Sequence, residues 1–171
     1  MDHRIVSFIV FSALAASIAW AQQRGYVLKR GDGELLMGGE AIIKVSPATG
    51  SQSGEVFWQT MASGGTTGIH IHHEADEFFY VVTGEGSALI GDQETPIAAG
   101  DVVFVPKGEQ HRLRHAGAEG SLEVVFFVDR PGLANEFREG HTRFEALGRW
   151  LTLEELNEIS ERHGTTYLTT E

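Results

Sequence analysis

Three histidines and one glutamate have the spacing of metal ligands on neighbouring β-strands. His70 and His72 are two residues apart, and residues i and i+2 of a strand point to the same face. Glu77 follows after a short turn and can add a carboxylate from the next strand. His111 stands just after a turn at residues 106–108, where another strand is predicted to begin. We therefore predict that His70, His72, Glu77 and His111 bind one metal ion.

The chemical character of these four ligands indicates the class of metal and a role in catalysis. Three neutral imidazoles and one carboxylate suit one divalent transition metal, with Fe, Mn, Co, Ni, Cu and Zn as the candidates. On an octahedral ion the set leaves two positions open, which a catalytic metal needs and a structural metal does not. We predict Glu77 as a catalytic residue too, because a carboxylate that leaves the metal can take a proton from the substrate. No site for an organic cofactor is predicted.

Other interpretations of the same residues stay open. The three histidines could be hydrogen-bonded core groups, although burying them together with a carboxylate and no metal would be costly. Glu77 could instead face solvent in an ion pair. On a regular strand His73 lies on the face opposite His72, so we expect it to be exposed or just outside the site. His115 shares the strand parity of His111, and both a pocket role and a structural hydrogen bond are open for it.

The residues around these ligands predict an all-β domain that spans residues 22–129. Short segments rich in Val, Ile, Phe and Tyr alternate with turns rich in Gly, Asp and Pro, which is typical of a sandwich or barrel. The predicted strands are residues 41–45, 55–61, 68–72, 77–83, 87–90, 102–105, 111–115 and 122–128. The last is nearly all apolar, so we expect it to be central and covered on both faces. We expect Trp58, Phe79, Phe104 and Phe127 to be core residues in preference to pocket residues, and Phe79, which shares parity with Glu77, is the best candidate of the four to face the pocket.

The pattern changes after Asp129, and residues 130–171 are predicted to be a helical tail packed on the β domain. Pro131 can begin a short helical turn that extends to Phe137. Thr152 and Glu155 form a capping-box pair, and Gly164 provides a stop for the helix that follows. A dimerisation helix is the alternative interpretation of this tail.

Residues 1–21 have the pattern of a secretory signal peptide. A short polar start containing Arg4 precedes an apolar stretch, and Ala19-Trp20-Ala21 offers small residues at a cleavage site. A membrane anchor and a buried helix are the alternatives, but the stretch is shorter than a bilayer span. We expect a mature chain that begins near Gln22 and is periplasmic or secreted.

Composition excludes several classes of function. The formal net charge of −11 argues against nucleic-acid partners and against binding to an anionic membrane after the leader is removed. The sequence contains no cysteine, which excludes disulfides, thiolate metal sites and a cysteine nucleophile.

Two motifs that contain the predicted ligands resemble those of the cupin superfamily. Gly64, five residues, His70-Ile71-His72, four residues, Glu77, six residues and Gly84 resemble the first cupin motif. Gly100, five residues, Pro106-Lys107-Gly108, two residues and His111 resemble the second. The resemblance implies a small antiparallel β-barrel, the double-stranded β-helix, with a metal inside and a C-terminal α-helical tail. The second motif commonly ends in Asn where this chain has His115.

The resemblance also implies a class of activity. The chain is similar to small single-domain, quercetin-dioxygenase-like cupins, which implies a metal-dependent enzyme that acts on a small organic molecule, with a dioxygenase as the leading expectation. A metal-dependent lyase, isomerase or decarboxylase would use the same ligands, and a non-catalytic metal- or ligand-binding cupin is a further alternative. A homodimer is expected, because such barrels often pair.

Overall fold

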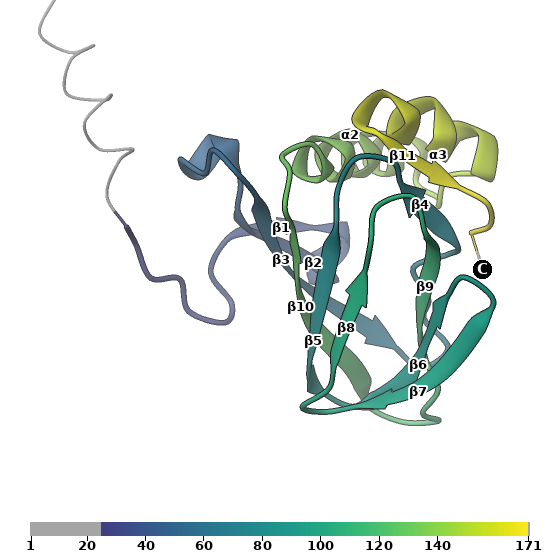
Figure 1. Cartoon of the computed structure of the whole chain (residues 1–171). Helices are drawn as coiled ribbons and strands as arrows, with labels where there is room; N and C mark the ends of the chain where they lie inside the picture. Colours follow the sequence, from purple (N-terminus) through teal and green to yellow (C-terminus); the bar gives the residue numbers. More distant parts are fainter. Residues whose placement is uncertain (1–24, 171) are drawn as a thin grey trace, which may run out of the picture.

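The computed structural model of this protein describes residues 25–170 (Figure 1). The predicted leader peptide, residues 1–21, lies outside the described residues. Within the described part of the chain, no helix has the length and apolar character needed to cross a membrane.

Two antiparallel sheets form most of the molecule (Figure 1). The six-stranded sheet has the order β1 (Glu34–Leu36), β2 (Ala41–Val45), β3 (Glu55–Ala62), β10 (Ser121–Val128), β5 (Glu77–Thr83) and β8 (Val102–Val105). The five-stranded sheet has the order β11 (Thr165–Tyr167), β4 (His70–His72), β9 (Gln110–His115), β6 (Glu85–Ile90) and β7 (Gln93–Ala98). The predicted all-β antiparallel fold with C-terminal helices is confirmed. Among the described residues the two sheets are not closed into the predicted barrel, and hydrogen bonding runs within two facing sheets of jelly-roll type.

Every predicted strand is present, and three further strands were not predicted. β1 and β11 contain only three residues each, too few for a recognisable alternation. β7 contains Pro96, which argues against a strand in the interior of a sheet, but β7 is an edge strand, where proline is tolerated.

The core lies between the sheets, because alternate residues of each strand point inward. Phe57, Phe126 and Phe79 are opposite one another on β3, β10 and β5, and all three are buried. The rings of Phe57 and Phe126 are stacked, with centroids 4.7 Å apart. Burying a side chain of this size stabilises the fold by about 1.5–3 kcal/mol.

The outer face of the six-stranded sheet differs from the expectation. β10 is central, as predicted, but it is not covered on both faces, since Phe127 is 38% exposed. The prediction that Trp58, Phe104 and Phe127 belong to the core is wrong. All three point outward from the sheet. Trp58 and Phe127 each follow a buried phenylalanine, Phe57 and Phe126, and so lie on the opposite face, and Phe104 pairs with the outward Phe78.

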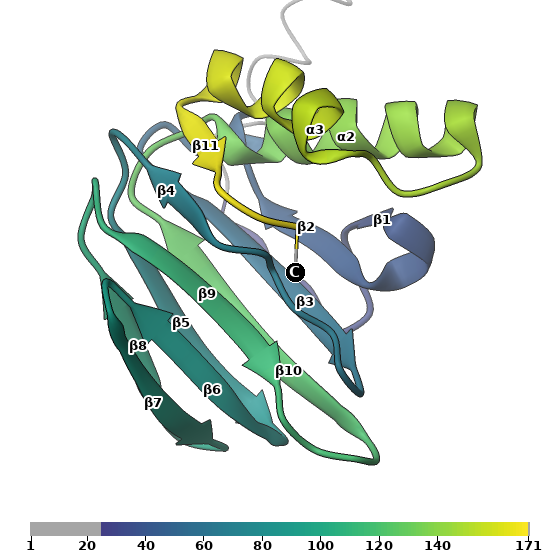
Figure 2. The same cartoon turned by 90° about the vertical axis from the view of Figure 1, so that its right-hand side faces the viewer.

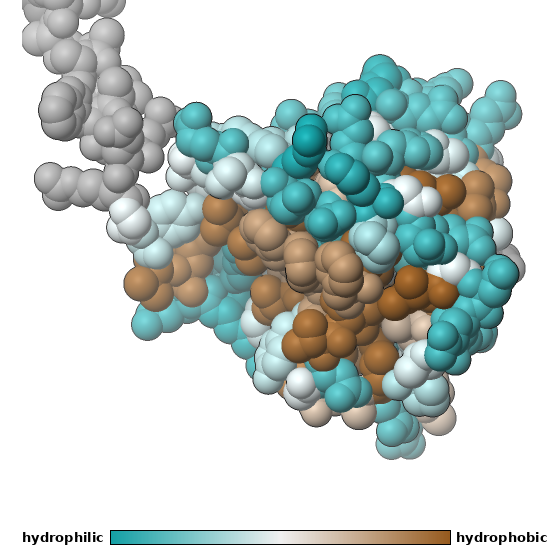
Figure 3. All heavy atoms as spheres, in the orientation of Figure 1, coloured by the Kyte–Doolittle hydropathy of each residue, from teal (hydrophilic) through white to brown (hydrophobic). Residues whose placement is uncertain are grey.

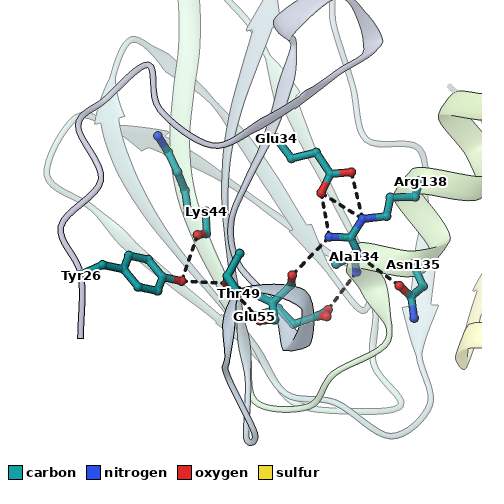
Figure 4. A network of polar contacts seen from close by, with 9 residues as sticks. Tyr26, Glu34, Lys44, Thr49, Glu55, Ala134, Asn135 and Arg138 are labelled. Carbon is teal, nitrogen blue, oxygen red and sulfur yellow. Dashed lines mark hydrogen bonds and ion pairs between the residues drawn. The ribbon is translucent and has the colours of Figure 1, made fainter. Parts of the chain in front are cut away.

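The first long helix, α2 (Leu133–Leu147), extends well beyond the short turn predicted as far as Phe137. Its N-cap is Gly132, which has no side chain to bind the free N–H groups of the first turn. Glu55 of β3 does so instead: Oε2 accepts hydrogen bonds from the N–H groups of Gly132 at 3.2 Å and Ala134 at 2.9 Å. In addition, Arg138 of α2 binds both carboxylate oxygens of Glu34 in β1 (Figure 4).

The second helix, α3 (Leu153–Ser160), begins as predicted. Thr152 and Glu155 form the capping box, with hydrogen bonds of 2.9 and 3.3 Å. The helix passes into the 3₁₀ turn η3 (Glu161–His163) and stops at Gly164, which has a left-handed conformation. Two further 3₁₀ turns, η1 (Met37–Gly39) and η2 (Pro47–Thr49), flank β2.

The helices and the last strand close one end of the sandwich. Figure 2 shows α2 and α3 side by side across the end where β4 and β11 lie. β11 pairs with β4, so that Thr165 is opposite His72 and Tyr167 is opposite His70. The C-terminal segment therefore contributes a strand, and not only helices, next to the predicted metal ligands.

Candidate metal centre

The structure brings all four predicted metal ligands together. One ligand atom from each of His70, His72, Glu77 and His111 lies within 4.8 Å of the other three. His70 and His72 point inward from β4, and His111 pairs with His70 from the adjacent strand β9. Glu77 comes from β5 in the opposite sheet, so the two sheets meet at this cluster. All four side chains are buried.

The distances show that the Nε2 atoms and the carboxylate converge on one point. Oε2 of Glu77 lies 2.8 Å from Nε2 of His111 and 3.3 Å from Nε2 of His72. The ring centroids of His70 and His111 are 4.1 Å apart, and those of His70 and His72 are 4.9 Å apart. This arrangement follows from the His-x-His alternation on β4 and the register between β4 and β9.

Each of the three histidines uses its other ring nitrogen to contact the surrounding protein. Nδ1 of His70 is 3.2 Å from the carbonyl oxygen of Gly68, and Nδ1 of His111 is 3.1 Å from that of Glu109. A carbonyl oxygen can only accept, so Nδ1 carries the proton in both rings. In the neutral ring of His70 this leaves the Nε2 lone pair free to bind a metal. Nδ1 of His72 lies 3.0 Å from Oγ1 of Thr165, a hydroxyl that can donate or accept and that orients the third ring.

The electrostatics of the cluster favour an ionised Glu77. Burial alone would raise the pKa of Glu77, but the adjacent His72 and His111 outweigh this effect and hold that pKa far below its usual range. Burial and the two neighbouring imidazoles lower the pKa of His70 well below its usual value, so His70 is neutral. For His72, burial lowers the pKa, but the Glu77 carboxylate offsets this and leaves it raised.

The donor set fits a divalent transition metal. Nε2 of His72 is buried and makes no hydrogen bond, although it lies close to Glu77. A cation at the centre of the cluster would satisfy this orphaned nitrogen, and buried nitrogen and oxygen donors of this kind are those that Zn, Fe, Mn, Co, Ni and Cu accept. The cluster is thus compatible with metal binding, and its residues are the ones that the spacing predicted.

A cavity of about 420 Å³ opens onto the cluster and lies between the sheets and the helices. His70, His72 and Glu77 line it, and so does Phe79, as predicted. Most of the remaining wall is apolar and comes from η1, β3, β10, α2, α3 and the α2–α3 connection: Met37, Met61, Phe126, Leu133, Phe137, Phe144, Trp150, Leu151 and Leu156. Among the described residues that line this cavity, none is a lysine or an arginine.

Three residues next to the cluster were not predicted from the sequence. The ring of Tyr167 stacks on His70, with centroids 5.0 Å apart, and lines the cavity. Glu136 of α2 is buried, and neither of its carboxyl oxygens has a hydrogen-bond partner. Burial raises the pKa of Glu136, while the side chain of Thr165 lowers it to a smaller extent. The run Thr-Thr-Tyr after Gly164 is a signal for a strand, but only its pairing with β4 places it at the site.

The two histidines without a predicted role have different environments. His73 is exposed, and its Nε2 lies 2.9 Å from Oγ1 of Thr166. His115 is buried, and it lies four residues along β9 from His111, about 13 Å at the rise of a strand. His115 does not line the cavity at the cluster, and its Nδ1 has no hydrogen-bond partner.

Comparison with known proteins identifies the family. Residues 57–128 match the family described as "Cupin domain". The chain is 27% identical over 129 residues to auxin-binding protein 4 of Zea mays, covering 70% of this chain and 59% of that protein. It is 37% identical over 54 residues to the oxalate-binding protein of Thermotoga maritima, covering 32% of this chain and 45% of that protein. The chain thus spans about half the length of the curated relatives it matches.

Solved structures show the same fold. A cupin 2 domain-containing protein from Halorhodospira halophila superimposes with a TM-score of 0.50 at 22% identity, covering 53% of this chain and 62% of that one. The family match and the two sequence motifs identify residues 57–128 as a cupin domain, and the solved structure supports its fold.

Proposed function

We propose that this protein is a metal-dependent enzyme that acts on a small, largely apolar organic molecule, with dioxygenase chemistry as the leading reaction. One observation carries the proposal: the cavity that exposes His70, His72 and Glu77 is walled mainly by aromatic and aliphatic side chains. A metal site that served only to stabilise the fold would have no need of such a cavity.

The metal ligands and the residues that line the cavity would have different roles in the reaction. A divalent metal held by the four ligands would lower the pKa of a substrate oxygen and offer a second open position for dioxygen or water. Glu77 is the carboxylate among the candidate ligands, and on leaving the metal it would take a proton from the substrate. Phe79, Phe126 and Phe137 contact the apolar body of the substrate and exclude water.

The wall of the cavity also selects against anionic substrates. Recognition of carboxylate or phosphate groups generally uses arginine or lysine, and the described lining contains neither. Arg112, the arginine next to His111 in sequence, points away and pairs with Glu94 at 3.1 Å. A sugar phosphate or a small dicarboxylate would therefore depend on the metal alone for charge neutralisation, whereas a flavonol or β-diketone would use both the metal and the apolar wall.

The test uses the purified protein and its own metal. Elemental analysis gives the metal content, and an oxygen electrode follows dioxygen uptake with flavonols and β-diketones. We expect near-stoichiometric metal and uptake that His72→Ala abolishes. A metal-loaded protein that consumes no oxygen with any of these compounds would contradict the dioxygenase proposal. Oxygen-independent conversion of a substrate would favour a lyase, isomerase or decarboxylase instead.

Non-catalytic binding is the second candidate, because relatives of this chain bear the names oxalate-binding and auxin-binding protein. In that case an apolar carboxylic acid such as an indole acetate would bind to the metal-loaded protein, measured by calorimetry, and would be recovered unchanged after prolonged incubation. Turnover of the bound compound would exclude this candidate.

We also propose that the protein is exported, on the basis of the N-terminal sequence pattern. Sequencing the N-terminus of the protein from its own cells would then find Gln22 at or near the start. An intact N-terminus on protein recovered from the cytosol would contradict this proposal.

A further inference from the structure

Glu136 of α2 has a buried carboxyl group without a hydrogen-bond partner. The residue is 2% exposed, and neither Oε1 nor Oε2 makes a hydrogen bond. Leu133, Phe137 and Gly140 share its face of the helix and line the cavity, so an apolar residue would be expected at position 136. In Figure 3 the outer surface over the two helices is mostly teal, the colour of hydrophilic residues. Glu136 therefore places a polar group on the inner side of α2, where its burial costs stability.

The helix dipole does not account for this burial. Glu136 lies in the first turn of α2, where a negative charge is favourable. An exposed carboxylate in that turn would be favoured in the same way without the cost of burial. In addition, Glu55 already accepts hydrogen bonds from the free N–H groups of the turn. A buried polar group that is kept without a partner indicates a functional role.

The polar groups that face Glu136 belong to the metal centre and to the strand beside it. Thr165 and Tyr167 are two residues apart on β11, so their side chains point to the same face, and they lie opposite His72 and His70. Burial raises the pKa of Glu136, while the hydroxyl of Thr165, the ring of His72 and the hydroxyl of Tyr167 each lower it to a smaller extent. The carboxyl group thus lies next to both hydroxyls, and Glu136 is not among the residues that line the cavity.

His72 differs from the other two histidines in the partner of its second ring nitrogen. Nδ1 of His70 and Nδ1 of His111 each contact a carbonyl oxygen, which can only accept, so the proton is fixed on Nδ1. Nδ1 of His72 contacts the Thr165 hydroxyl, which can donate or accept. If this hydroxyl donates, the proton of the neutral ring lies on Nε2, the nitrogen that would bind the metal. A group that accepts a hydrogen bond from the Thr165 hydroxyl would prevent this.

We propose that Glu136 is a positioning residue of the metal centre. When the metal is bound, it accepts a hydrogen bond from the Thr165 hydroxyl, so that Oγ1 of Thr165 accepts one from Nδ1–H of His72. The inference rests on metal binding at the cluster, which is part of the proposed function. Either oxygen of a carboxylate and the carbonyl oxygen of a protonated carboxyl group can accept, so the ionisation state of Glu136 does not decide this role. Contacts of this kind behind a metal ligand fix its tautomer and its orientation.

The affinity of matched variants for Zn²⁺ tests this proposal. The full chain is used, and binding is measured by competition with a chelator. Glu136→Met removes the acceptor at similar side-chain volume and should weaken binding about 10–100-fold. Glu136→Gln keeps an acceptor oxygen and should bind nearly as tightly as the wild type. Glu145→Met, at an exposed position of the same helix, makes the same change of charge and should leave the affinity unchanged.

Two further measurements separate this role from a purely structural one. Without metal, the melting temperature of Glu136→Met should equal or exceed that of the wild type, because an unsatisfied buried carboxyl group has been removed. A residue that only held α2 in place would lower it. In a Thr165→Val background, Glu136→Met should weaken Zn²⁺ binding less than about twofold further, because its effect passes through Thr165.

The possible results distinguish this inference from the proposed function. If the wild type binds Zn²⁺ and folded Glu136→Met binds it equally tightly, the inference is overturned and the proposed function stands. Losses of affinity that add in the double variant, or a lower melting temperature of metal-free Glu136→Met, would also overturn the inference. A wild type that binds no transition metal would overturn both. Circular dichroism verifies the fold of each variant, and Glu136→Leu replaces Glu136→Met if the latter does not fold.

Discussion

Nδ1 of His72 lies 3.0 Å from Oγ1 of Thr165, although 93 residues separate them in the chain. The pairing of β11 with β4 places Thr165 directly opposite His72. A hydroxyl from the last strand thereby orients a ligand that belongs to the first motif, and it turns Nε2 of His72 toward Glu77. The C-terminal segment is part of the metal centre through this contact.

Removal of this hydroxyl should weaken metal binding. Thr165→Val keeps the volume of the side chain but leaves Nδ1 of His72 without a partner. We expect the affinity for Zn²⁺ or Co²⁺, measured by competition with a chelator, to fall about 10–100-fold, the usual effect of losing a contact behind a metal ligand. Thr165→Ser retains the hydroxyl and should bind nearly as tightly as the wild type. Equal affinities for the Val and Ser variants would show that Thr165 does not orient His72.

His72→Ala should abolish stoichiometric metal and lower the melting temperature. A ligand that binds only the folded state stabilises it, by about 2.7 kcal/mol at 100 times its Kd. Elemental analysis and calorimetry measure the two effects. His73→Ala is the matched control, since His73 is exposed one residue away, and it should retain its metal. An unchanged metal content in His72→Ala would refute the assignment of this ligand.

Glu55→Ala should destabilise α2. The carboxylate of Glu55 accepts two N–H groups of the first turn, and these donors would be left unsatisfied in a buried place. We expect a loss of about 1–3 kcal/mol in the free energy of unfolding, measured with urea. Glu55→Gln keeps one acceptor oxygen and should lose less. If Glu55→Ala unfolds at the same urea concentration as the wild type, then α2 does not depend on this cap.

The ion pair between Glu155 and Arg149 predicts a pH dependence. The hydrogen bond from Arg149 lowers the pKa of Glu155 to about 2. A carboxylate with a lowered pKa stabilises the folded state at pH values above about 4.5, and this stabilisation is lost as the pH falls toward 2.

Glu155→Gln tests this dependence while it preserves the capping geometry. Its melting temperature should be slightly below that of the wild type at pH 7, and the difference should shrink as the pH falls below 4.5. A difference that is constant from pH 7 to pH 3 would mean that the charge of Glu155 contributes nothing.

Local sequence patterns were sufficient to predict most of the strands and the start of α3. The strands at residues 77–83 and 102–105 consist almost entirely of aromatic and β-branched residues, and such signals lie within a few neighbouring residues. The capping of α2 was not accessible in this way, because Glu55, which accepts hydrogen bonds from the N-terminus of α2, lies in a different element, β3. The exposure of Phe104 and Phe127 was also missed, since alternation shows that two faces differ but not which one is buried.

The metal ligands themselves follow from the spacing of the residues and from the two motifs. The His-x-His pair shares a face because its segment is a strand, and the two motifs add Glu77 and His111. The other residues next to the metal ligands could be identified only from the tertiary structure. Thr165, Tyr167 and Glu136 reach the cluster only because β11 pairs with β4 and α2 docks over the end of the sandwich. Contacts between residues so far apart depend on strand pairing and helix packing, and no local pattern in the sequence encodes them.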